Sequence, residues 1–154
     1  MKTISDRGFT FIEIILTLAT LSVIAITAIP SDNGLSPFAL DAAARKVKTD
    51  IRYAQNMATT TGDAYGFRVT GASTYEIYDV ATDAIPLSPY TNTPMQENLE
   101  DDFGTVIFVD QASQVEFNSY GRPSLGGGSL IEISYGGDSK TIQVTATSGY
   151  VSFQ

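Results

Sequence analysis

The chain opens with a short polar segment and continues as a long apolar one. Residues 1–8 carry three charged side chains, whereas residues 9–30 carry a single charge, Glu13. At about 1.5 Å per helical residue, residues 9–29 span roughly 31 Å, which is close to the hydrocarbon thickness of a bilayer. The pattern predicts a long hydrophobic transmembrane helix over residues 9–30, with Glu13 inside its apolar zone.

A second, amphipathic helix is expected further along the chain. The turn-forming residues after Pro30 predict a hinge over residues 31–39, and Gly62 is a helix stop signal. Between them apolar residues recur at helical intervals of four and three, on one face of a helix over residues 40–61. This stripe, which we expect to pack on the chain's own sheet, consists of Leu40, Ala44, Val47, Ile51, Ala54 and Ala58.

From residue 64 to residue 154 the apolar pattern alternates with a period of two, which is typical of strands. Residues 84–102 contain three prolines and an acidic cluster and are predicted to be mainly loop. We therefore expect an α+β fold with a globular domain over residues 40–154, in which the helix packs on a small antiparallel β domain of about seven short strands. The predicted strands are residues 66–69, 74–79, 105–109, 114–118, 129–135, 141–146 and 150–153.

Composition narrows the possible functions. The 154 residues suffice for one domain with a modest core, and the net charge of -8 disfavours general attraction to nucleic acid phosphates. The chain contains no cysteine and no histidine, which excludes disulfides, Cys/His zinc sites, thiol nucleophiles and histidine-based acid–base catalysis. We expect neither an enzyme nor a bound cofactor.

The flanks of the apolar segment indicate its orientation. Lys2 and Arg7 precede the segment, and no basic residue follows it until Arg45. By the positive-inside rule, we expect the N-terminus to lie in the cytoplasm and the rest of the chain to be exported. A secretory signal peptide cleaved after Ala28 is an alternative, but Ile26 is too large for that site. A buried core helix would need a larger surrounding domain, and a plain anchor leaves Glu13 unexplained.

Glu13 is the residue that most needs a functional explanation. An unpaired acid within a membrane helix costs ~2.5 kcal/mol on insertion scales, so such residues commonly mark function and have a partner. The run from Gly8 to Glu13, Gly-Phe-Thr-Phe-Ile-Glu, resembles the prepilin motif of type IV pilins and type II secretion pseudopilins. Pro30 falls where such proteins commonly carry a helix-bending proline.

This resemblance implies a defined maturation and location. A prepilin peptidase would cut between Gly8 and Phe9, Phe9 would be N-methylated, and the exported domain would lie in the periplasm. The protein would be a single-pass protein of the bacterial inner membrane before it enters a filament with other pilins. Cleavage exposes an ammonium group on Phe9, and that group, from the same or a neighbouring subunit, could pair with Glu13. Glu13 would then be an assembly residue.

The exported part is similar to the minor pseudopilins of the GspH/FimT type. The likeness rests on the helical run 42–58 with residues 61–62 and 65–67 after it, on residues 115–123 and on residues 142–152. A DNA-uptake branch of that group binds DNA through a C-terminal Gly-Arg-x-Arg element, but this chain has Gly-Tyr-Val-Ser at residues 149–152. We therefore expect no nucleic acid partner and keep a DNA-binding minor pilin as the alternative function. The sequence leaves open whether the machine is a secretion system or a pilus.

One acidic loop is a weak candidate for a metal site. Its carboxylates could supply oxygen ligands for calcium, but their spacing is not that of an EF-hand, and a solvated loop explains them better. These residues are Glu97, Glu100, Asp101 and Asp102.

Overall fold

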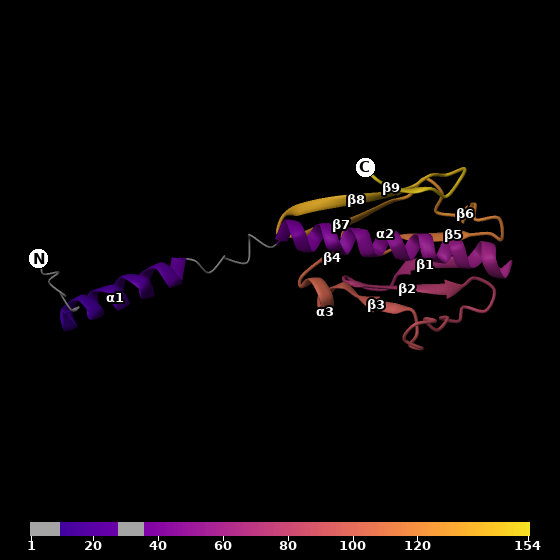
Figure 1. Ribbon diagram of the computed structural model, residues 1–154. Helices are drawn as coiled ribbons and strands as arrows, with labels where there is room; N and C mark the ends of the chain where they lie inside the picture. The colour runs from indigo at the N-terminus through magenta and orange to yellow at the C-terminus, as the bar shows by residue number, and fades with distance from the viewer. Residues whose placement is uncertain (1–9, 28–35) are drawn as a thin grey trace, which may run out of the picture. The chain divides into compact units, whose positions relative to one another are not determined.

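The structure is a computed structural model that describes residues 10–27 and 36–154 (Figure 1). The chain divides into two units, residues 1–34 and residues 35–154. The described part of the first unit is helix α1, Phe11–Thr27, 17 residues long, with Thr10 before it. The predicted span of 9–30 extends beyond α1 at both ends, onto residues that lie outside the described part. No helix within residues 10–27 or 36–154 is both long enough and apolar enough to cross a membrane.

The second unit begins with the long helix α2, Ser36–Thr61. All six residues of the predicted apolar stripe are buried, with Leu40 the most accessible at 5%. The helix starts at Ser36, four residues before the predicted start, so residues 36–39 of the predicted hinge are helical. A proline in the first turn, here Pro37, suits a helix start because its missing N–H has no intrahelical acceptor there.

Nine strands follow in the described part of the chain, and they form two antiparallel sheets. The first sheet has the order β3-β2-β1-β5-β6 and the second the order β4-β7-β8-β9. The elements are β1 Tyr65–Val69, β2 Thr74–Asp79, β3 Gln96–Asn98, α3 Leu99–Phe103, β4 Ile107–Phe108, β5 Gln114–Phe117, β6 Pro123–Leu125, β7 Leu130–Tyr135, β8 Asp138–Val144 and β9 Val151–Phe153.

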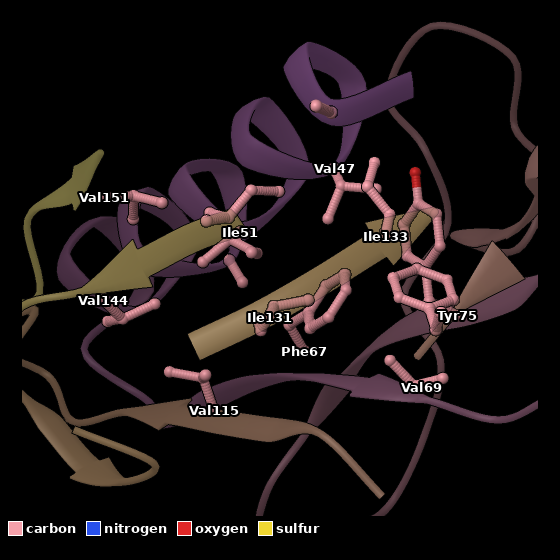
Figure 2. Close-up of a cluster of buried hydrophobic side chains, with 14 of the residues drawn as sticks. Val47, Ile51, Phe67, Val69, Tyr75, Val115, Ile131, Ile133, Val144 and Val151 are labelled. Atoms are coloured by element: carbon pink, nitrogen blue, oxygen red, sulfur yellow. The ribbon is translucent and has the colours of Figure 1, made fainter. Parts of the chain in front are cut away.

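The buried core lies between α2 and the inner faces of both sheets (Figure 2). Ile51 of α2 meets residues of the second sheet such as Ile131, and aromatic residues of the first sheet complete the cluster. The ring of Tyr75 lies 5.0 Å from that of Phe67, measured between centroids. Every buried apolar residue of the described core belongs to residues 35–154, so this unit has a core of its own.

The predicted α+β fold, with a helix packed on antiparallel sheets, is confirmed. All seven predicted strands are present: β2 has the predicted ends, the other six have shifted ends, and β6 was not predicted. The predicted loop over residues 84–102 is wrong at its end, because β3 and α3 occupy residues 96–103. Asn98 caps α3, since its Oδ1 accepts the Glu100 N–H at 3.1 Å, and the first residue of α3, Leu99, is fully buried.

Candidate functional site

The first turn of α1 holds Glu13 in a defined local arrangement. The backbone N–H groups of Glu13 and Ile14 donate to the Thr10 carbonyl, at 3.0 and 3.2 Å. In return, the Thr10 N–H donates to Oε2 of Glu13 at 3.4 Å. A Thr-x-x-Glu pattern with this contact is half of a capping box, a helix-start signal that our reading of the sequence missed. Glu13 therefore helps to begin α1, whatever else it does.

The described surface of α1 is predominantly apolar, with Thr10, Glu13, Thr17 and Thr20 along one face. All residues from 10 to 22 are exposed, and the large apolar ones include Phe11 at 79%, Leu16 at 65% and Leu21 at 61%. A helix with so much exposed apolar surface is stabilised by an apolar environment, such as lipid or a bundle of similar helices. Because this apolar surface is exposed, we expect α1 to lie in lipid or to pack against similar helices.

The hydroxyl groups of α1 make hydrogen bonds within the helix. Thr17 donates to the Ile14 carbonyl at 2.9 Å, Thr20 to the Leu16 carbonyl at 3.0 Å, and Ser22 to the Ala19 carbonyl at 2.8 Å. These groups need no water when the helix is surrounded by apolar groups. Within residues 10–22, Glu13 is thus the one side chain that would carry a charge into such surroundings.

The remaining residues predicted from the prepilin motif lie outside the described residues. These are Gly8 and Phe9, at the expected cleavage position, and Pro30, at the expected bend. The predicted roles of these residues stay predictions.

The four acidic residues of the candidate metal loop divide between two local roles. Glu97 forms an ion pair with Lys46, between Oε2 and Nζ, at 3.2 Å. Glu100, Asp101 and Asp102 occupy the first turn of α3, where negative charge favours the helix N-terminus. Within residues 10–27 and 36–154, no group of three or more acidic side chains is placed to hold a metal ion.

A polar cluster attaches this acidic end of the domain to α2. The buried Tyr75 hydroxyl donates to Oδ2 of Asp50 at 2.5 Å, and Lys46 contacts both Asp50 and Glu97. Burial, together with the Asp50 charge, raises the pKa of Tyr75 well above its usual range. Burial opposes the charged form of Lys46, yet the two carboxylates raise its pKa overall. The ion pair of Lys46 with Glu97 therefore joins β3 to α2, beside the place where α3 contacts the same helix.

An arginine and a tyrosine, residue types that can contact nucleic acid, each directly precede a strand. Arg122 and Tyr150 are both exposed, Tyr150 at 62%, in the β5–β6 and β8–β9 connections. Gln55 of α2 joins these turns, because its Nε2 donates to the Gly121 carbonyl at 2.7 Å and to the Ser148 carbonyl at 3.1 Å. Sequence reasoning missed this junction, since no local pattern relates Gln55 to either turn.

Comparison with known proteins shows the fold alone. Two crystal structures of the type IV minor pilin FimU from Pseudomonas aeruginosa, strain PAO1, are similar to this chain, with TM-scores of 0.58 and 0.56. Sequence identity is 14% in both, and the match covers 75% of this chain and 87% or 92% of FimU. No protein-family model matches the chain. No curated protein matches it either. The fold of the chain is therefore pilin-like.

Proposed function

We propose that this chain is a structural subunit of a filament, a minor pilin or pseudopilin of a type IV pilus or a type II secretion system. One observation carries the proposal: a predominantly apolar helix bears a single acid in its first turn and precedes a pilin-like α+β unit. The similarity to a minor pilin of P. aeruginosa supports the same class. The proposal assigns no catalytic step and no cofactor.

In the proposed cycle the chain enters the bacterial inner membrane with its N-terminus in the cytoplasm and its globular unit in the periplasm. A residue span of 9–30 would then cross the bilayer. Prepilin peptidase would cleave between Gly8 and Phe9, and Phe9 would be N-methylated. Methylation of an amine retains its positive charge. Pro30 would bend the helix where it leaves the apolar layer.

Assembly would follow from the isolation of Glu13. A carboxylate among apolar groups is penalised unless a donor neutralises it. In a bundle of α1 helices, the new N-terminal ammonium of a subunit can supply that donor. Pairing would then set the axial position of one helix against the next, and the apolar surfaces of α1 would be buried between subunits and other pilins.

Processing provides the first test. Co-expression of the full chain with a prepilin peptidase is expected to yield a product that begins at Phe9, detected by N-terminal sequencing and by the mass of the first peptide. A Gly8→Leu variant is the matched control and is expected to keep Met1 or to be cut much less. A wild-type chain that keeps residues 1–8, or that begins after Ala28, would contradict the proposal.

A further inference from the structure

The second sheet has one face on which no described residue is buried. Successive residues of a strand point to opposite sides, and on β7 Ile131 and Ile133 belong to the core beneath α2. Leu130, Glu132 and Ser134 therefore lie on the other side of the sheet. Together with the residues that the cross-strand register places beside them, they form what we call the open sheet face: Ile107, Val109, Leu130, Glu132, Ser134, Ser139, Thr141, Gln143 and Ser152.

Apolar side chains flank the one charge on the open sheet face, that of Glu132. Val109 lies beside it, because the Val109 N–H donates to the Glu132 carbonyl at 2.9 Å, and Leu130 is two residues before it on β7. Val109 is 56% exposed, Leu130 49% and Ile107 41%. Glu132 forms no ion pair with a described residue, and Asp110, next to Val109, adds negative charge at this edge. Exposed apolar groups around an unpaired carboxylate suit a partner that is basic.

The outward surface of α2 carries charge of that sign. From residue 38 onward its exposed positions include Arg45 and Arg52 but no acid. Arg45 is paired with Asp41 at 2.6 Å, whereas Arg52 forms no ion pair with a described residue. The half-buried Lys48 forms none either, and its Nζ lies 4.5 Å from the centroid of the Phe153 ring. We call the following residues the basic helix face: Arg45, Lys48, Thr49, Arg52, Tyr53 and Asn56.

The acids on α2 and at its ends do not neutralise Arg52. Asp50 is only two residues away, but it points to a different side of the helix, where it forms an ion pair at 3.3 Å. Asp41 lies eleven residues before Arg52 and Asp63 eleven residues after it, in each case about 16 Å along the axis of α2. Asp138 lies beside Asp41, at the same end of the helix. The Arg52 guanidinium is therefore available to a carboxylate from another molecule.

A hollow beside Arg52 gives the basic helix face a shape for one side chain. Its volume is about 170 Å³, and its lining consists of Thr49, Arg52, Tyr53 and Asn56. A branched aliphatic side chain such as that of Val109 fits a space of this size. In the hollow it would exclude water from the guanidinium, and the exclusion of water strengthens the attraction between Arg52 and a carboxylate.

We infer that the open sheet face of one copy of this chain binds the basic helix face of a second copy, with Glu132 beside Arg52 and Val109 in the hollow. Because α2 packs on the inner side of the second sheet, the two surfaces lie on opposite sides of the globular unit (Figure 1). The contact is therefore heterologous, and its repetition builds a ring or a line of subunits rather than a two-fold dimer. It goes beyond the proposed function by naming a contact between globular units. It does not depend on cleavage at Gly8, so the two proposals fail separately.

Cross-linking tests this contact in the unit that carries its own core, residues 36–154. Because the chain has no cysteine, one single variant on each face, Asn56→Cys and Thr141→Cys, can be mixed and oxidised. Asn56 lies one helical turn beyond Arg52, and Thr141 lies opposite Glu132. The ratio of mixed to like disulfides is expected to exceed the statistical ratio by at least about threefold, and the excess is expected to decrease as salt rises. Formation of mixed and like pairs in the statistical ratio would overturn the inference.

Exchange of the two charges identifies the residues responsible. Arg52→Glu in the Asn56→Cys partner is expected to remove the excess, and Glu132→Arg in the Thr141→Cys partner is expected to restore it. Arg122→Glu makes the same change in net charge in the β5–β6 connection and is the matched control. Equal losses from Arg52→Glu and Arg122→Glu, or no recovery when the charges are exchanged, would also overturn the inference.

The apolar part of the contact has a control of its own. Val109→Ser in the Thr141→Cys partner is expected to lower the excess, because the hollow then receives no aliphatic group. Leu87→Ser changes another exposed apolar residue, 54% accessible, and is expected to leave the excess unchanged. Equal effects of the two substitutions would contradict this docking. Unchanged unfolding midpoints confirm that the variants are folded.

Discussion

The ring of Tyr78 lies directly over Gly66, at a place where no side chain could fit. The two residues face each other across β1 and β2, and a Cβ on Gly66 would lie 2.5 Å from two ring carbons of Tyr78. The bare backbone lets the Tyr78 hydroxyl reach Oε1 of Glu116 on β5, to which it donates at 2.7 Å. The Arg68 guanidinium covers the ring at 4.3 Å from its centroid. Gly66 thus permits a polar bridge across three strands.

Gly66→Ala is expected to destabilise the globular unit by about 1–3 kcal/mol, since the new methyl group must displace the ring. Denaturant unfolding of residues 36–154 measures the change. If the ring is the obstacle, the cost of Gly66→Ala falls when Tyr78→Ala is already present. An equal cost in both backgrounds would show that Gly66 is not needed to make room for the Tyr78 ring.

Alkaline pH is expected to destabilise the fold through ionisation of Tyr78. Burial, followed by the hydrogen bond to Glu116, raises the pKa of Tyr78 to about 12, from about 10 in an unfolded chain. Between these values the folded state retains a proton that the unfolded state loses, so the free energy of unfolding decreases as pH rises from 10 to 12. Unfolding of the Tyr78→Phe variant, followed over that range, is expected to show a shallower decrease. Identical slopes would contradict the assignment.

Truncating a residue of the apolar stripe on α2 is expected to destabilise the globular unit. Ile51→Ala is expected to cost about 2–5 kcal/mol, because Ile51 is fully buried and its removal leaves a cavity between helix and sheets. Thr60→Ala, on the exposed surface of the same helix, is the matched control and is expected to change stability by less than about 0.5 kcal/mol. Thermal or denaturant unfolding compares the two. Similar costs for both would mean that α2 does not pack by this stripe.

What could be predicted from the sequence depends on the range of the interactions involved. The stripe from Leu40 to Ala58 is a periodic pattern, and the structure buries all of it. By contrast, α3 is only five residues long and depends on the Asn98 cap and on burial of Leu99, which no period reveals. The contact of Gln55 with Gly121 joins residues 66 apart in the chain, so only the folded structure places it. The Thr10–Glu13 cap is a local Thr-x-x-Glu pattern, so the sequence alone could have indicated it.

Glu13 has two explanations, as part of the cap of α1 and as a charge needed for assembly, and replacing it with glutamine distinguishes them. A glutamine at this position can still accept the Thr10 N–H, as the capping box allows Glu or Gln, but it carries no charge. Glu13→Gln should therefore leave the start of α1 and the cleavage after Gly8 intact. If Glu13 pairs with an N-terminal amine, the variant is expected to enter filaments about tenfold less, the equivalent of ~1.4 kcal/mol. The measurement is the fraction of processed subunit in sheared or purified filaments.

Thr17→Val is the matched control for Glu13→Gln, because it also changes a polar residue of α1 but removes only a hydroxyl that bonds within the helix. Its incorporation is expected to equal that of the wild type. If glutamine at position 13 supports full incorporation, the charge has no role in assembly and the cap alone accounts for Glu13. If both variants are processed but only Glu13→Gln is excluded, the helix start is not the cause, and the carboxylate must meet a cation that another subunit or the mature N-terminus supplies.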